Sequence, residues 1–432
     1  MVTNYQTYVG LSAPISFNGL VRHYDMRKGD DVADIQVNLI EKSERSEQSH
    51  DIAKSMRADL QKIGKRYGAN VKVVEVPPGP PVMSTIVAEI YGPSHDKQIE
   101  VAGKIKNILS HTDNVVDVDW SVESDQKEYT FMVNKDKAMK LGIPSAQVVQ
   151  TMHVALSGMQ VGVLHLPSVE NQVGIVLQLP ERDKAAIADV MDLKIVNPQG
   201  ISVPLGDLVT VSNGVKEKSI NRKNQKRVVY VLAEVAGNLE SPIYPMMDVS
   251  NKLSKIKLPN GSSIKEEYSK QPDSEDQFSL KWDGEWKITY EVFRDLGIAF
   301  LFVLILIYIL IVGWFQSFLT PLIQLSAIPL SLIGIILGHW AMGAYFSAPS
   351  MIGFIALAGI MVRNSILLID FIDIRLKNGI GLKQAIIDAG AVRTTPIVLT
   401  AGSVVLGALV ILFDPIFQGL AISLIGGTIT ST

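Results

Sequence analysis

The segment 359–368, Gly-Ile-Met-Val-Arg-Asn-Ser-Ile-Leu-Leu, places an arginine and an asparagine inside a long apolar run. This run extends from 349 to 372, which is long enough to cross a bilayer, since a crossing helix needs roughly 20 residues. A charge at such depth costs about 2.5–3.5 kcal/mol on translocon-based scales, so Arg363 needs a partner inside the protein. We therefore expect Arg363 and Asn364 to be functional. A structural arginine that snorkels or bonds backbone carbonyls is the alternative.

Further apolar runs of similar length flank this one, at 296–315, 321–342 and 396–413. A fifth begins at Pro415 and is still apolar at Thr432, so we expect four complete membrane helices and one that is cut short. The alternative for the fifth is a natural terminus at a frayed helix end. Small residues that predict close helix packing lie in these runs, namely Gly334, Gly338, Gly402 and Gly407.

The charged residues divide the chain into two parts. The protein has 432 residues, a formal net charge of −3 and no cysteine, and only nine Asp, Glu, Lys or Arg residues follow Asp295. A polar part is therefore followed by a membrane part, which excludes a purely soluble enzyme and a disordered chain. The near-neutral balance offers no basic face for nucleic acid. The basic loop 375–393 weakly favours a polar part outside the cytoplasm.

The polar part shows the alternation of strands and amphipathic helices. Two strand–helix–strand units are predicted, with elements at 33–40, 46–67, 71–76, 85–91, 98–109 and 115–122. A β-rich lobe with turn signals follows, and the second unit returns with elements at 228–235, 243–258 and 263–268. We predict α+β subdomains of ferredoxin-like βαβ units, an inserted β-rich lobe and an all-α transmembrane bundle. The expected domain ranges are 1–83, 84–157, 158–227, 228–295 and 296–432.

The sequence carries no motif for catalysis. Neither the phosphate-binding G-x-x-x-x-G-K-[ST] nor the zinc-binding H-E-x-x-H occurs, and G-x-S-x-G is also missing. The seven histidines are scattered, so each is better explained as a surface or core residue than as a ligand. We expect no enzyme, no metal site and no cofactor.

Five stretches resemble the C-terminal half of a resistance-nodulation-division (RND) efflux permease of the hydrophobe/amphiphile, multidrug branch. The last two are the most specific, and the five lie in family order at 140–149, 200–209, 314–329, 359–368 and 393–400. The resemblance implies a homotrimer in the bacterial inner membrane, with porter and docking regions in the periplasm. It also implies an adaptor protein, an outer-membrane channel and membrane lipids as partners. Amphiphilic or hydrophobic compounds would be exported by proton antiport, with the proton gradient as the energy source.

The same resemblance assigns a proton relay. Arg363 falls where drug exporters usually carry a lysine that pairs with acids of the other half, which this chain lacks. Asn364, Arg393 and Thr400 match relay positions. Asp370 lies two turns beyond Arg363 on nearly the same face, although it could be merely interfacial. The heavy-metal branch typically has an acid near position 363, so its absence argues against metal export.

Candidate substrate contacts are Phe17, Val82 and Met83, because the family binds substrate in an apolar cleft between porter subdomains. Plain core packing is the alternative for all three. Two other functions stay open: a related superfamily permease that moves lipids or assists protein export, and a membrane-anchored periplasmic binding or sensor protein.

Overall fold

The computed structural model describes residues 2–14, 17–22, 28–75, 82–237, 241–254, 258, 263–414 and 416–432, without the side chains of residues 17, 18 and 30. The chain forms two compact units. One unit combines Met1–Ser121 with Ile220–Thr432, and the other is Val122–Ser219.

The first unit begins with a small α+β module, which we define as residues 2–75. Strands β1 (Val2–Leu11) and β2 (Lys28–Leu39) form an antiparallel ladder, and helix α1 (Phe17–Val21) lies between them in sequence. Helix α2 (Ser49–Arg66) follows a short 3-10 turn, η1 (Lys42–Glu44).

The strand expected at 71–76 is wrong for its described part, because residues 71–75 adopt no strand. Side chains satisfy this backbone instead of a neighbouring strand. The amide of Val73 donates to Asp117 Oδ2 at 3.3 Å, and its carbonyl accepts from Arg57 Nη2 at 3.3 Å. The alternating sequence therefore gives an extended segment without a ladder.

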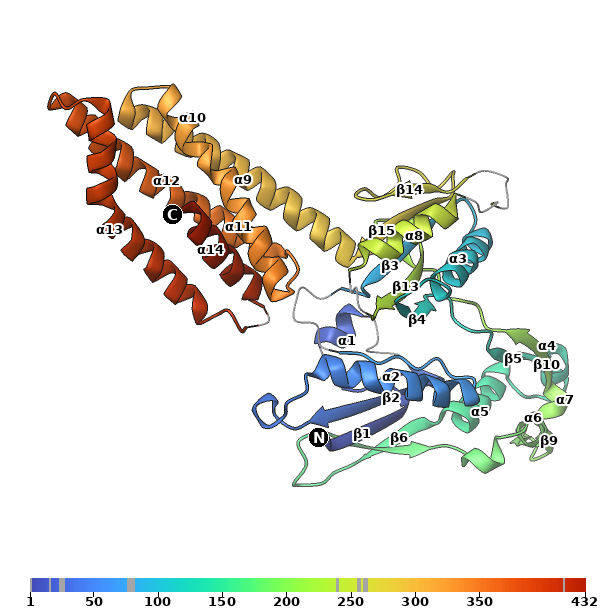
Figure 1. Ribbon diagram of the computed structural model, residues 1–432. Coiled ribbons are helices and arrows are strands. Elements are labelled where there is room, and N and C mark those ends of the chain that lie inside the picture. Colours follow the sequence, from blue (N-terminus) through green and yellow to red (C-terminus); the bar gives the residue numbers. More distant parts are fainter. Residues whose placement is uncertain are drawn as a thin grey trace. The chain divides into compact units, whose positions relative to one another are not determined.

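A five-stranded sheet, which we call the sheet module together with its helices, follows in the same unit. Its strand order is β14 (Lys265–Glu267), β15 (Ser279–Gly284), β3 (Ile86–Tyr91), β13 (Val229–Val235) and β4 (Val115–Trp120). Helix α3 (His95–Ser110) packs against β13, β4 and β3, and α8 (Ile243–Leu253) packs beside α3 (Figure 1). Strands from both sides of the inserted lobe thus share one sheet, as the predicted return of the second unit requires.

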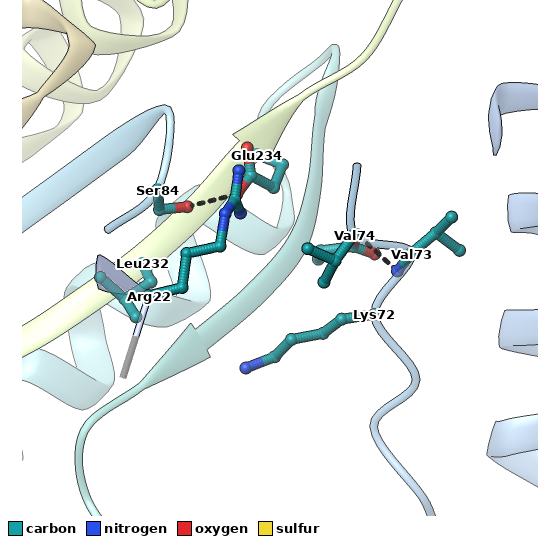
Figure 2. A pocket seen from close by; sticks show the side chains of 8 residues that line it. Arg22, Lys72, Val73, Val74, Ser84, Leu232 and Glu234 are labelled. Carbon is teal, nitrogen blue, oxygen red and sulfur yellow. Dashed lines mark hydrogen bonds and ion pairs between the residues drawn. The ribbon is translucent and has the colours of Figure 1, made fainter. Parts of the chain in front are cut away.

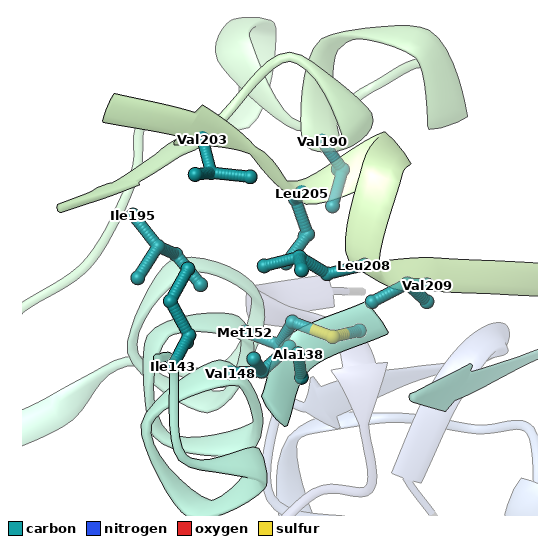
Figure 3. Close-up of a cluster of buried hydrophobic side chains, with 10 residues drawn as sticks. All are labelled: Ala138, Ile143, Val148, Met152, Val190, Ile195, Val203, Leu205, Leu208 and Val209. Atoms are coloured by element: carbon teal, nitrogen blue, oxygen red, sulfur yellow. The ribbon is translucent and has the colours of Figure 1, made fainter. Parts of the chain in front are cut away.

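The Val122–Ser219 unit is built on the ladder of β5 (Lys127–Val133) with β10 (Val209–Val215). Its other elements are α4 (Lys135–Lys140), α5 (Ser145–Ser157), β6 (Met159–Leu164), β7 (Val173–Leu177), η2 (Glu181–Asp183), α6 (Ile187–Met191), β8 (Lys194–Val196), β9 (Ser202–Pro204) and α7 (Leu205–Leu208). Side chains of α4 and α5 share one apolar core with those of α6 to α7 (Figure 3). This shared core explains why the unit begins at Val122, ahead of the lobe range 158–227, which stays a prediction. A small hairpin of β11 (Arg222–Lys223) and β12 (Lys226–Arg227) follows in the first unit.

Among the described residues 285–414 and 416–432, six helices make up the C-terminal part (Figure 1). They are α9 (Glu285–Phe315), α10 (Leu319–Leu325), α11 (Ala327–Met342), α12 (Ala348–Lys377), α13 (Leu382–Leu409) and α14 (Gln418–Ser431). Where the structure describes the chain, four helical segments are long and apolar enough to cross a membrane, at 285–315, 319–342, 348–377 and 382–409. The predicted fold class is therefore observed: α+β domains followed by a helical bundle with four apolar spans.

Glycines bring α11 and α14 into close contact. A Cβ added at Gly334 would lie 2.2 Å from the carbonyl oxygen of Gly426, and one at Gly338 would lie 3.0 Å from Ile422 Cγ2. The predicted close packing at these two glycines is confirmed. Gly402 and Gly407 have no such neighbour within 4 Å in the described part of the chain, so close packing at these two positions stays a prediction.

Candidate functional site

Arg363 lies a little past the middle of α12, next to the side chains that hold the helix bundle together. Met361 and Val362 are buried in the apolar cluster of the bundle, whereas Arg363 is exposed. One residue corresponds to about 100° of rotation on a helix, so Arg363 turns away from the neighbours that cover Met361 and Val362. It makes no ion pair with any acid among the residues that the structure describes.

Asn364 is half-buried beside it. The Oδ1 atom of Asn364 is fully covered and has no hydrogen-bond partner among the described residues. A covered carbonyl oxygen without a donor costs about 1–3 kcal/mol, so this position is suited to receive a donor from another segment.

The remaining relay candidates have local partners. Thr400 Oγ1 donates to the carbonyl of Ile397 at 2.9 Å, the back-bond that a lone threonine in a membrane helix usually makes. The guanidinium carbon of Arg393 lies 5.1 Å from the centre of the Phe371 ring, within cation–π range. Asp370, on α12, is half-buried. Within the described structure, no hydrogen bond or ion pair joins any two of the five predicted relay residues.

The candidate substrate contacts fit the packing alternative. Val82 is 9% exposed, and Met83 packs against a buried apolar cluster of the sheet module. Phe17 lies in α1, but its side chain is outside the described atoms. A cavity of about 10 Å³ lies nearby and has room for about one water molecule (Figure 2). Its lining is largely charged and comprises Arg22, Lys72, Val73, Val74, Ser84, Asp117, Leu232 and Glu234.

The sequence analysis missed a buried ionic cluster in the centre of the sheet. Glu89 is 0% exposed on β3 and pairs with Lys281 on β15 at 3.1 Å and with Lys223 on β11. Asp283 lies 2.7 Å from both lysine ammonium groups. The sequence did hold a signal for this cluster: Glu89 is a charged residue inside the apolar strand Ile86–Tyr91. A buried acid must be paired, so such a residue predicts a buried cation beside it.

Burial raises the pKa of Glu89, and a hydrogen bond with Asp283 adds to that rise. Burial alone would also raise the pKa of Asp283, but hydrogen bonds with Glu89, Lys223 and Lys281 outweigh it and hold that pKa well below its ordinary range. The two acids thus differ in proton affinity although they share the same lysines.

One histidine is embedded in the helix bundle. His339 is 5% exposed, its Nε2 lies 2.8 Å from Ser350 Oγ and its Nδ1 lies 2.8 Å from the carbonyl oxygen of Ile335. A neutral imidazole satisfies both contacts, with Nδ1 donating and Nε2 accepting. His339 is therefore a hydrogen-bonded core histidine, as expected from the sequence.

Comparison with known proteins gives a match over nearly the whole chain. The model of the AcrB/AcrD/AcrF family matches residues 11–432. The chain is 27% identical over 352 residues to the swarming motility protein SwrC of Bacillus subtilis, which covers 79% of this chain and 31% of SwrC. It is 23% identical over 361 residues to the cobalt-zinc-cadmium resistance protein CzcA of Cupriavidus metallidurans, covering 81% of this chain and 32% of CzcA. It is 22% identical over 335 residues to the multidrug resistance protein MdtC of Proteus mirabilis, covering 76% of this chain and 31% of MdtC.

A crystal structure of a heavy metal efflux pump has the same fold, with a TM-score of 0.68 and 20% identity. That match covers 92% of this chain and 39% of the pump. The chain spans about a third of the length of these curated relatives. Their names include both metals and drugs, so the comparisons do not single out the hydrophobe/amphiphile branch.

Proposed function

Since the chain belongs to the AcrB/AcrD/AcrF family of RND permeases, we propose that it is part of an efflux transporter of the bacterial inner membrane. In this proposal the polar part lies in the periplasm and the complete protein exports amphiphilic or hydrophobic compounds by proton antiport. It works as a homotrimer with an adaptor protein and an outer-membrane channel.

A single observation carries the proposal: Arg363 is exposed near the middle of α12, a helix that is long and apolar enough to cross a membrane. Arg363 keeps its charge at any physiological pH, so the group that gains and loses protons must be its counter-ion. We infer that carboxylates on another segment of the complete polypeptide fill that role. The uncovered side of Arg363 supports this inference.

The energy for such a step is available. Protonation of the carboxylates would release Arg363, and the helices that carry the charges would then shift between two packings. A membrane potential supplies about 2.3 kcal/mol per charge per 100 mV, which is enough to bias the shift.

The test is efflux by the full-length protein with Arg363 changed to alanine and to lysine. We expect loss with Arg363→Ala and partial retention with Arg363→Lys, which preserves the charge but not the fork geometry. Leu367→Ala is the matched control, because Leu367 is also exposed on α12, one turn later. Full efflux by Arg363→Ala would contradict the relay, whereas absence of efflux from the unchanged protein would favour a binding or sensor protein.

Metal export is the second candidate, because relatives such as CzcA carry names of metal resistance. The positive charge at Arg363, where the heavy-metal branch typically has an acid, favours the amphiphile reading. Accumulation of cobalt, zinc and cadmium ions and of an amphiphilic cationic dye should be measured in the same cells. Export of the metals without the dye would replace the first proposal with the second.

A further inference from the structure

In the part of the chain that the structure describes, we consider three ion pairs that join the first α+β module to the sheet module within one compact unit. We call this set of contacts the seam. The pairs are Arg57 with Asp117, Lys72 with Asp119 and Arg22 with Glu234. Every cation comes from the first module, and every acid comes from the sheet module. Separation of the modules would therefore break all three pairs together.

Asp117 has an unusual backbone for a residue inside a strand. Its φ angle is 52°, in the left-handed region that few residues other than glycine adopt. The pairing of β13 with β4 shifts at this point, from Leu232 opposite Asp119 to Glu234 opposite Val116. One extra residue of β4 is thus accommodated, which is a β-bulge, and bulges redirect side chains.

The carboxylate of Asp117, which the bulge redirects, accepts hydrogen bonds from the first module. Its side chain is 2% exposed and accepts a hydrogen bond from Arg57 Nη1. It also accepts from Gln61 Nε2 at 2.8 Å and from the amide of Val73 at 3.3 Å. Three donors from the first module therefore converge on one acid that the sheet holds in a disfavoured conformation, and such strain persists only where the surroundings maintain it.

Glu234 is held differently, because its own module keeps it in place. It accepts from Ser84 Oγ at 3.0 Å and from Thr85 Oγ1 at 2.5 Å, besides pairing with Arg22 at 2.5 Å (Figure 2). If the modules separated, Glu234 would keep its hydrogen bonds from Ser84 and Thr85. Asp117 would lose all three donors of the first module.

We propose that the seam is a releasable lock between the two modules, closed in this structure, and that Asp117 is its positioning residue. The lock rests on the proposed function and adds to it that the periplasmic part changes its arrangement when the membrane helices shift. Opening the seam removes the donors that hold Asp117 in place, and the bulge relaxes. Closing restores them, so one strained residue links the backbone of β4 to the position of α2.

The test measures the distance between the modules in the full-length protein. Spin labels are placed by Lys62→Cys on α2 and Asn107→Cys on α3, which are both exposed positions, after any cysteine outside this cysteine-free chain has been replaced by serine. Asp117→Asn keeps the shape of the side chain and removes its charge. We expect it to raise the population of longer label distances at least about fivefold, as loss of about 1 kcal/mol of coupling would.

Asp113→Asn is the matched control, because Asp113 is an exposed acid four residues before Asp117. Arg57→Met should reproduce the effect of Asp117→Asn, and the double variant should add nothing, since both remove the same interaction. Gln61→Ala is the variant to use if Asp117→Asn fails to fold, because it leaves every charge in place. We expect it to lengthen the label distances in the same direction but by less.

Unchanged distances in Asp117→Asn and Gln61→Ala, or an equal change in Asp113→Asn, would overturn the lock. The distances are measured without transport, so the two proposals can fail separately. If Asp117→Asn lengthens the label distances but the unchanged protein exports nothing, the lock stands and the proposed function is overturned. Intact export with unchanged distances overturns the lock alone.

Discussion

Alanine at position 334 tests how α11 and α14 are held together. A Cβ added at Gly334 would lie 2.2 Å from the carbonyl oxygen of Gly426 and 2.2 Å from Thr430 Oγ1. The contact is reciprocal, because a Cβ at Gly426 would lie 2.4 Å from the carbonyl oxygen of Gly334. The carbonyl of Gly426 is backbone and cannot rotate away, so the two helices must move apart.

The required movement sets the size of the effect. An ordinary contact needs at least about 3.4 Å, so the helices separate by roughly 1 Å and lose dispersion contacts along their interface. Overpacking of this kind costs about 1–3 kcal/mol, and contact between membrane helices depends on such packing. For a bundle of this size we expect the apparent Tm to fall by roughly 2–12 °C.

The assay is thermal unfolding of the full-length protein in lipid nanodiscs. Gly402→Ala is the matched control, because no described atom lies within 4 Å of a Cβ at that position. It should be neutral or stabilising, since alanine is the better helix former by about 1 kcal/mol. Adding Thr430→Ala to Gly334→Ala should restore stability only in part, as the carbonyl contact stays. An unchanged Tm in Gly334→Ala, or an equal loss in Gly402→Ala, would refute this account of the interface.

Three further changes test other parts of the chain. Leu205→Ala empties a fully buried position in the core of Figure 3 and should cost about 2–5 kcal/mol, seen as faster hydrogen exchange across Val122–Ser219 with no change elsewhere. Asp283→Asn leaves the buried Lys281 and the half-buried Lys223 with one acid and should cost about 3–5 kcal/mol at pH 7. Because the folded pKa of Asp283 lies below its ordinary value of about 3.9, its stabilisation is complete above that pH and is lost as the pH falls through the folded value. The deficit measured by thermal unfolding should therefore shrink below about pH 4, and a constant deficit would contradict the pairing. Ser350→Ala removes the donor to His339 Nε2 and should lower the Tm of the bundle by an amount that corresponds to about 1–3 kcal/mol, whereas an unchanged Tm would show that water replaces the hydroxyl.

The sequence alone determined the kinds of element and their order. The membrane helices follow from apolar runs of sufficient length, and the α+β modules follow from alternation and helical periodicity, which are local properties of the chain. The resemblance of segments such as 359–368 identified the family, because those motifs are also local. The position of Arg363 near the middle of an apolar helix could be predicted in the same way.

Only the tertiary structure decided which elements meet. It placed β3 between β15 and β13, which lie far away in sequence. It also brought Gly334 against Gly426, whereas Gly402 has no described neighbour within 4 Å. The left-handed conformation of Asp117 and its donors from α2 also depend on distant contacts. A local pattern specifies which face of an element is apolar, but the partner of that face is chosen by packing between segments that the chain must first bring together.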